Sequence, residues 1–504
     1  MPTQLTLDQI RDFKGKYPKQ LWYLFFSEMW ERFCFYGMRG MLVIFMVDRT
    51  VGLGMKDDTA NLQYGATQAF VYAFTFIGGL FADKILGFRK SLFWGGLLMI
   101  TGSCILAFNP HDLFFTGISF TIIGTGFFKP NISTMVGMLY RSDDSRTDAG
   151  FSLFYAGINL GALIGGYACV VIAKNYSWNL AFGLAAIVMT ISLITFVFTQ
   201  RSLGPIGLSP LAISADDSKP WYQFSSQRWK EYLTYLGSFA CIPVIMVMVS
   251  NTQYTDWFMY IIGPCTLVYL LYEMRNCSAA ENKKLLAALI FVIFSIFFWA
   301  FFEQSGGSLS LFAANHLTDK VLGVNLDPNG VNNSSNSFFV IIFASLLGLV
   351  WLWMAKRKIE PNTVVKFGLG FLFLAAGFYI FYYTKFFADE NGVTSLGWFT
   401  FGWFIITFGE LCLSPIGMSI MTKLSPQKLQ GVMMGMWFLA SAYGQYVAGI
   451  LGAGMSAANE NATLSEKLIA YTDGYRQLAI YALIAGVLMI FISPYVRKLM
   501  QEVK

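Results

Sequence analysis

The residues best able to do chemistry are charged side chains that stand inside long apolar runs. Six residues of the stretch SEMWERFCFYGMRG (27–40) form a pattern of two acids, two bases and two rings, namely Glu28, Glu31, Arg32, Phe35, Tyr36 and Arg39. Their spacings of three, one, three, one and three residues place all six on one face of a helix. An ionisable group in a lipid bilayer costs at least about 2.5–3.5 kcal/mol. We therefore predict that this stripe borders an aqueous cavity, and the alternative is a structural ladder of ion pairs.

Three further charges fall inside apolar runs. Lys129 stands in GTGFFKPN (124–131), where the glycines allow a neighbouring helix to approach. We predict a functional role for this lysine, and the alternative is a side chain that reaches back to the cytoplasmic edge of the membrane. Glu303 lies in FFWAFFEQSGGS (297–308) and Glu410 in FGELCLSPIGMS (408–419). Each of these carboxylates is predicted to be functional, and the alternative is permanent pairing with a base.

The distribution of these charges suggests the kind of ligand. The first half of the chain supplies Arg32, Arg39 and Lys129, whereas the second half supplies Glu303 and Glu410 without an intramembrane base. A zwitterionic peptide would fit, with its carboxylate on Arg32 and Lys129 and its ammonium on Glu410. We further infer that a proton moves together with the ligand. No histidine belongs to this set of intramembrane charged residues, so carboxylates must bind that proton. We expect a proton on Glu303 to release Arg39 or Lys129.

Aromatic and amide side chains complete the predicted site. Rings at helical spacing in membranes more often serve packing or interfacial belts than ligand contact. Amides can bond either end of a peptide, although a loop or cap role is an equal alternative for Asn336. The candidates are Phe35, Tyr36, Tyr72, Trp299, Trp437, Asn159 and Asn336.

These residues need a membrane-spanning scaffold. Of the 504 residues, 56% are hydrophobic and 13% charged, with a mean hydropathy of +0.54. Soluble domains carry roughly 25% charged residues. Apolar runs of about the 20 residues that a spanning helix needs recur along the whole chain. We predict fourteen spans, near 21–48, 62–87, 90–109, 112–140, 149–173, 178–199, 230–250, 255–274, 284–315, 335–355, 363–387, 394–421, 429–454 and 474–499.

The spans group as six, two and six. We therefore expect a cytoplasmic N-terminal segment (1–20), a six-helix bundle (21–200), a linker with two extra helices (201–283) and a second six-helix bundle (284–504). With the N-terminus inside, 25 of the 35 lysines and arginines fall on cytoplasmic segments and 7 outside. This asymmetry predicts a multi-pass protein of the cell (inner) membrane with both termini cytoplasmic.

The composition argues against a nucleic-acid-binding protein, a metalloprotein, a membrane enzyme and a channel. The net charge of +6 follows from the basic cytoplasmic loops and needs no nucleic acid. The seven cysteines form no CxxC pair and there are two histidines, so we expect no metal, no cofactor and no catalytic residue. A membrane enzyme would need paired histidines, a metal cluster or an activated nucleophile. A channel would show repeated selectivity rings.

Two motifs resemble signatures of a known family. EMWERFCFYG (28–37) resembles the ExxERFxYYG signature of the proton-dependent oligopeptide transporters of the major facilitator superfamily, and FYAGINLGAL (154–163) resembles their second signature. The segment GGLFADKILGFRK (78–90) is similar to the basic loop motif of the superfamily. The resemblance covers essentially the whole chain, including the two extra helices of bacterial members.

The resemblance implies an all-α major facilitator fold and an alternating-access symporter of di- and tripeptides and protons, in contact with membrane lipids. It implies that Glu28, Glu31 and Arg32 serve proton coupling and peptide binding, and that Lys129 and Arg39 are partners of Glu303. Asn159, Asn336 and Glu410 would hold the peptide ammonium, and Tyr36 and Tyr72 would lie near its backbone. Trp299, Trp437 and Ser441 match pocket positions more loosely.

The sequence departs from the family pattern at two positions. Phe35 replaces the first tyrosine of the signature, and Phe302 stands where some relatives carry an acid just before Glu303. Because of both changes, the sequence does not predict which peptide side chains the protein prefers. The alternative within transport is a relative that carries another small solute, such as an amino acid, nitrate or a conjugated metabolite.

Overall fold

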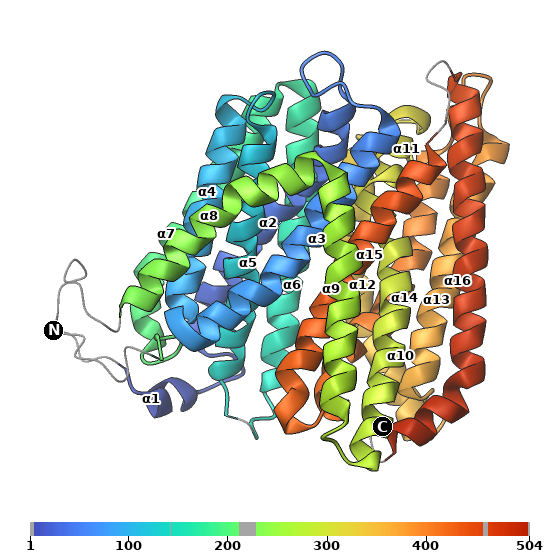
Figure 1. Ribbon diagram of the computed structural model, residues 1–504. Helices are drawn as coiled ribbons and strands as arrows, with labels where there is room; N and C mark the ends of the chain where they lie inside the picture. Colours follow the sequence, from blue (N-terminus) through green and yellow to red (C-terminus); the bar gives the residue numbers. More distant parts are fainter. Residues whose placement is uncertain (1–4, 142, 211–227, 457–461, 502–504) are drawn as a thin grey trace. The chain divides into compact units, whose positions relative to one another are not determined.

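The fold is almost entirely helical (Figure 1). The computed structural model describes residues 5–141, 143–210, 228–456 and 462–501. Its helices are α1 (Leu7–Arg11), α2 (Lys19–Val47), α3 (Asp57–Phe81), the π-helix η1 (Ala82–Leu86), α4 (Phe88–Phe108), α5 (Phe114–Met138), α6 (Thr147–Asn175), α7 (Trp178–Thr199), η2 (Gln200–Leu203), α8 (Trp229–Ser250), α9 (Thr252–Met274), α10 (Ala279–Phe302), η3 (Glu303–Gly306), α11 (Ser308–His316), α12 (Pro328–Lys356), α13 (Thr363–Tyr383), η4 (Thr384–Phe387), α14 (Leu396–Leu424), η5 (Gln427–Leu429), α15 (Gln430–Met455) and α16 (Leu464–Met500). A short antiparallel hairpin pairs β1 (Lys320–Val321) with β2 (Val324–Asn325).

Every predicted span corresponds to a helix or to a helix with a short continuation. Among the described residues, eleven helices are long and apolar enough to cross a membrane. The other three, α2, α5 and α15, have 29, 25 and 26 residues. At 1.5 Å per residue each exceeds the bilayer core of about 30 Å. Their charged, polar and small residues leave these three helices less apolar than the other eleven. The total of fourteen spans therefore stays a prediction.

Two helices begin well before the predicted spans because polar residues cap them. Asp327 accepts a hydrogen bond from the backbone of Gly330 and Pro328 occupies the first helical position, so α12 starts seven residues early. Thr463 and Glu466 form a capping box that starts α16 ten residues early. Hydropathy alone does not detect such polar outer turns.

The helices pack into two compact units, which are described separately. Unit 1 comprises the described residues up to Met41 together with Phe70–Ser250. Unit 2 comprises Leu42–Ala69 and the described residues from Asn251 onward.

Unit 1 depends on close helix crossings at glycine. A Cβ added to Gly95 on α4 would stand 2.5 Å from the carbonyl oxygen of Gly124 on α5, and one added to Gly124 would stand 2.7 Å from the carbonyl oxygen of Gly95. Gly126 on α5 meets the backbone of Phe74 on α3 in the same way. The prediction that the glycines of GTGFFKPN admit neighbouring helices is confirmed, because only glycine allows backbones to approach so closely.

Unit 2 is arranged around α13, which runs beside α14 and α16 (Figure 1). Helix α10 packs along α15. The first half of α3 also belongs to this unit, because Gly65 lies directly against Gly449 of α15, where an added Cβ would stand 2.7 Å from the partner Cα.

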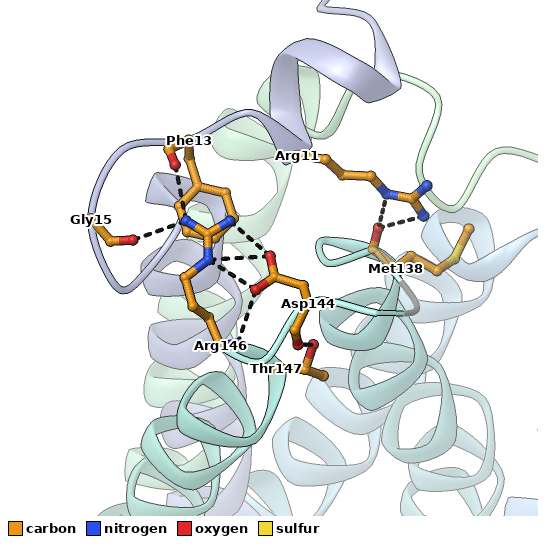
Figure 2. Close-up of polar contacts among 7 residues, drawn as sticks. All are labelled: Arg11, Phe13, Gly15, Met138, Asp144, Arg146 and Thr147. Atoms are coloured by element: carbon orange, nitrogen blue, oxygen red, sulfur yellow. Dashed lines mark hydrogen bonds and ion pairs between the residues drawn. The ribbon is translucent and has the colours of Figure 1, made fainter.

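The N-terminal segment is tied to the loop between α5 and α6 (Figure 2). Arg146 donates hydrogen bonds to the carbonyl oxygens of Phe13 and Gly15 at 3.1 and 3.0 Å, and its guanidinium lies 3.9 Å from the centre of the Phe13 ring. Asp144 fixes the same guanidinium at 2.7 Å. From α1, Arg11 donates to the carbonyl oxygen of Met138. These contacts define an N-terminal strap, residues 5–16, on unit 1.

Candidate functional site

The charged stripe of α2 is helical throughout and deeply buried. Glu28, Glu31 and Arg32 are 2%, 0% and 2% exposed. Nε of Arg32 lies 2.9 Å from Oε1 of Glu28 and 2.7 Å from Oε2 of Glu31. Both are charge pairs rather than well-aligned hydrogen bonds, and Nη2 of Arg32 and Oε1 of Glu31 make no hydrogen bond to any described residue. The ladder of ion pairs that was the alternative prediction is therefore present. Polar atoms of Arg32 and Glu31 within it still have no hydrogen bond to a described residue.

Lys129 of α5 joins this cluster. Its ammonium lies 4.4 Å from the centre of the Tyr72 ring on α3 and 5.5 Å from that of Phe35, which is a cation–π arrangement. Its positive charge acts on both Glu28 and Glu31. The side chain thus turns toward α2 and α3, which favours a role in the cluster over that of a lysine reaching back to the membrane edge.

Arg39 and Tyr36 continue the stripe one turn further along α2. The Arg39 guanidinium lies 5.7 Å from the centre of the Tyr36 ring, and Arg39 is 9% exposed. The Phe35 and Tyr36 rings meet edge to face at 5.3 Å. Phe35 thus contributes a packed ring to the stripe but no hydroxyl.

Glycines of α6 hold α2 in position. Gly157, Gly161 and Gly165 recur every four residues, and each lies directly against α2, with an added Cβ at Gly161 standing 3.0 Å from Cβ of Arg32. The sequence prediction missed this role, although the GxxxGxxxG spacing in FYAGINLGALIGG signals it. Asn159 of α6 is 7% exposed and donates to the carbonyl oxygen of Tyr155, in its own helix, at 3.0 Å.

In unit 2 the helix that carries Glu303 is broken at that residue. Helix α10 ends at Phe302, the single 3₁₀ turn η3 covers Glu303–Gly306, and α11 resumes at Ser308. Glu303 is 3% exposed. Gly306 and Gly307 stand where α11 takes over from this turn.

Buried amides bond backbone carbonyl oxygens at the break and on the neighbouring α15. Asn332 of α12 donates to the carbonyl oxygen of Ser305 at 2.7 Å, and its own oxygen accepts from Trp403 at 3.2 Å. Gln304 donates to the carbonyl oxygens of Ala300 and Ala448 at 3.1 and 2.9 Å. The sequence prediction missed both amides, although the polar run NNSSNS (332–337) is the signal that would have found Asn332.

Asn336 and Glu410 meet in unit 2. Nδ2 of Asn336 on α12 donates to Oε2 of Glu410 on α14 at 2.8 Å and lies 3.4 Å from Oγ1 of Thr407. The cap alternative for Asn336 is wrong, because Asp327 caps α12 and Asn336 lies more than two turns inside it.

Trp299, Trp437 and Ser441 lie on α10 and α15. Ser441 donates to the carbonyl oxygen of Trp437, and Gly444 admits the Trp299 side chain. Nε1 of Trp299 is buried and finds no acceptor among the described residues. Both tryptophans and the serine therefore belong to one helix pair of unit 2.

The structure thus assembles one set of predicted site residues in unit 1 and two in unit 2. Unit 1 brings together Glu28, Glu31, Arg32, Lys129 and Tyr72, with Tyr36 and Arg39 adjoining. Asn159 is not brought into this set by any contact described above, because its amide bonds the carbonyl oxygen of Tyr155 in its own helix. Unit 2 brings together Asn336 and Glu410, and separately Trp299, Trp437 and Ser441. Among the described residues, no cluster of histidine, cysteine and carboxylate side chains could hold a metal ion.

Comparison with known proteins identifies the family to which the chain belongs. Residues 89–468 match the sequence profile described as the POT family. The chain belongs to the POT family. It is a membrane transporter rather than an enzyme, and it has the major facilitator fold of the solved POT proteins.

The similarity to individual POT proteins extends over nearly the full chain. A peptide transporter of Yersinia enterocolitica is 32% identical, over 98% of this chain and 97% of the relative. The dipeptide and tripeptide permease A of Pectobacterium carotovorum is 28% identical, over 97% and 93%. A crystal structure of a peptide transporter POT in complex with sulfate superposes with a TM-score of 0.83 at 30% identity, over 98% of this chain and 99% of that one.

Proposed function

We propose that this POT-family protein imports di- and tripeptides together with protons by alternating access, as a multi-pass protein of the inner membrane with both termini in the cytoplasm. The names of its relatives, a peptide transporter and a dipeptide and tripeptide permease, support the substrate class. The asymmetric distribution of lysine and arginine supports the orientation.

One observation carries the coupling proposal, namely that Arg32 contacts Glu28 and Glu31 at once. With Lys129, the ionised cluster holds two negative and two positive charges. A peptide carboxylate arriving at Arg32 would add a third negative charge in a setting of low dielectric, where unbalanced charge is costly. A proton taken up by Glu28 or Glu31 restores the balance. Substrate and proton are therefore expected to enter together.

The proposed roles of the remaining residues rest on the resemblance of their motifs to those of the family. Nη2 of Arg32 retains hydrogen-bonding capacity for the peptide carboxylate. Glu410, oriented by Asn336, is proposed to hold the peptide ammonium, with Asn159 as a further amide and Tyr36 and Tyr72 near the backbone. Trp299, Trp437 and Ser441 are proposed to line the side-chain region. Pairing of Glu303 with Arg39 or Lys129 remains part of the proposal.

Uptake of labelled dialanine into proteoliposomes, with and without an inward proton gradient, tests the function. We expect accumulation only with the gradient. Glu31→Gln keeps the shape of the side chain but fixes it in the neutral state. It should therefore exchange dialanine across the membrane in counterflow while losing gradient-driven accumulation. Accumulation that ignores the gradient, or a Glu31→Gln variant that accumulates normally, would overturn the coupling. Accumulation of an amino acid or nitrate in place of dialanine would favour the alternative substrate classes.

A further inference from the structure

A groove on unit 1 lies apart from the charged stripe. Its volume is about 600 Å³, and its walls come from the end of α3, the π-helix η1, α5 and α8. Phe74, Ile77 and Phe81 form one wall at helical spacing, and Leu233, Gly237 and Cys241 form part of the other. The groove is therefore apolar along most of its length.

Polar contacts with α4 hold α8 in its position beside this groove. Trp94 of α4 donates to Oγ of Ser238 at 3.0 Å, and Lys90 pairs with Glu231 at 2.8 Å. The pair with Lys90 neutralises the acid of α8 that lies next to the groove. Helix α8 is thus fixed in place by α4 and forms a stable wall of the groove.

Positive charge is confined to one end of the groove. Lys84 of η1 and Lys230 of α8 line that end, and both are exposed. Among the described residues, neither lysine forms an ion pair. The π-helix contributes by turning two consecutive residues, Lys84 and Ile85, onto the groove, and such irregular turns often mark functional positions.

The dimensions match one leaflet of a bilayer. From Lys230 to Cys241 the groove follows eleven steps of α8, which is about 16 Å at 1.5 Å per residue. Half of the hydrocarbon core is about 15 Å. A ligand that fills the groove therefore has an apolar part as long as one acyl chain and an anionic group at the end where the lysines stand.

We propose that this groove is a binding site for an anionic phospholipid, with an acyl chain along α3 and α8 and the phosphate between Lys84 and Lys230. Basic pockets between membrane helices suit such head groups. In the orientation proposed above, the lipid comes from the cytoplasmic leaflet. The site itself does not depend on the transported substrate.

Two variants and a matched control test the site. Lys84→Ala/Lys230→Ala removes the charge from exposed positions, and Gly237→Phe fills the groove, because a Cβ at Gly237 meets no atom within 4 Å. Lys283→Ala/Lys423→Ala removes the same charge from exposed or half-exposed positions of unit 2. Each purified protein is titrated with phosphatidylglycerol and with phosphatidylcholine, and bound lipid is counted by native mass spectrometry.

The wild type should bind one phosphatidylglycerol in preference to phosphatidylcholine. The double lysine variant should lose that preference by about 10- to 30-fold, as expected for two lysines next to an anionic head group. Gly237→Phe should lose the bound lipid, and the control pair should behave as the wild type. Equal binding of both lipids by the wild type, unchanged binding in either groove variant, or the same loss in the control pair would overturn the proposal. Because lipid binding is the readout, failure of this proposal is distinct from failure of peptide transport.

Discussion

The side-chain amide of Asn336 on α12 donates a 2.8 Å hydrogen bond to the carboxylate of Glu410 on α14. An amide donor favours the ionised carboxylate and fixes its direction. The carboxylate proposed to receive the peptide ammonium is therefore positioned by a neighbour from another helix.

Asn336→Ala should raise the KM for dialanine by about 10- to 100-fold, since a hydrogen bond to a charged group contributes about 1.5–3 kcal/mol. The measurement is the concentration dependence of uptake. The matched control is Asn333→Ala, because within the described part of the chain the Asn333 amide bonds the carbonyl oxygen of Asn329, in its own helix, and no carboxylate. Equal KM values for the two variants would argue against the role of Asn336.

Arg32→Lys tests whether the guanidinium is required to serve two acids at once. A lysine ammonium is a compact charge on a flexible stem and does not reproduce the planar arrangement that meets Glu28 and Glu31. We expect gradient-driven dialanine uptake to fall at least about tenfold, with the protein still monodisperse in detergent. The exposed Arg141→Lys serves as control, and a variant at Arg32 with normal uptake would contradict the proposed coupling.

Arg146→Ala should release the N-terminal strap, because Arg146 bonds the backbone of both Phe13 and Gly15 (Figure 2). Trypsin should then cut at Lys14 and Lys16 several-fold faster than in the wild type. Arg141→Ala is the control, since its pair with Asp8 at 3.7 Å is long and exposed. Unchanged cleavage in Arg146→Ala would show that other contacts hold the strap.

The same strap should respond to acid. The hydrogen bonds from Arg146 lower the pKa of Asp144 from 3.8 to about 2. Because the folded-state pKa is lowered, the stabilisation is complete above about pH 4 and is lost as the pH falls toward 2. Hydrogen exchange at Phe13–Gly15, corrected for its intrinsic rate, should accelerate over that interval. Asp144→Asn should remove the pH dependence.

Gly95→Ala should destabilise unit 1, because its Cβ would stand 2.5 Å from the carbonyl oxygen of Gly124 and would force α4 and α5 apart. We expect a loss of about 1–3 kcal/mol, read as a lower melting temperature in detergent. Gly348→Ala on α12 meets no atom within 4 Å and should be neutral or slightly stabilising. A lower melting temperature for both would point to a general loss of helix flexibility instead.

The sequence predicted the fold from the recurrence of apolar runs, and it predicted the stripe of α2 because buried charges at helical spacing are rare. It did not predict the early starts of α12 and α16, since polar turns outside the apolar run are held by capping residues such as Asp327 and Thr463. For the same reason Asn336 was expected near a helix end.

The supporting residues of the site were harder to predict. Gly157, Gly161 and Gly165 act by lacking side chains, and Asn332 acts by satisfying a carbonyl oxygen 27 residues earlier in the chain. Such roles depend on which helices become neighbours. Composition and spacing do not encode that information for a single helix.

The interruption of the helix at Glu303 has a mechanical consequence. In a continuous helix, a carboxylate keeps its direction when a neighbouring residue bends, because the hydrogen-bond ladder spreads the deformation over several turns. Glu303 instead begins the single 3₁₀ turn that separates α10 from α11. Any change in the angle between these two segments reorients this carboxylate, and any change in its charge alters the force that its surroundings exert on the joint. The charge of Glu303 and the angle between α10 and α11 are thus linked at a single residue.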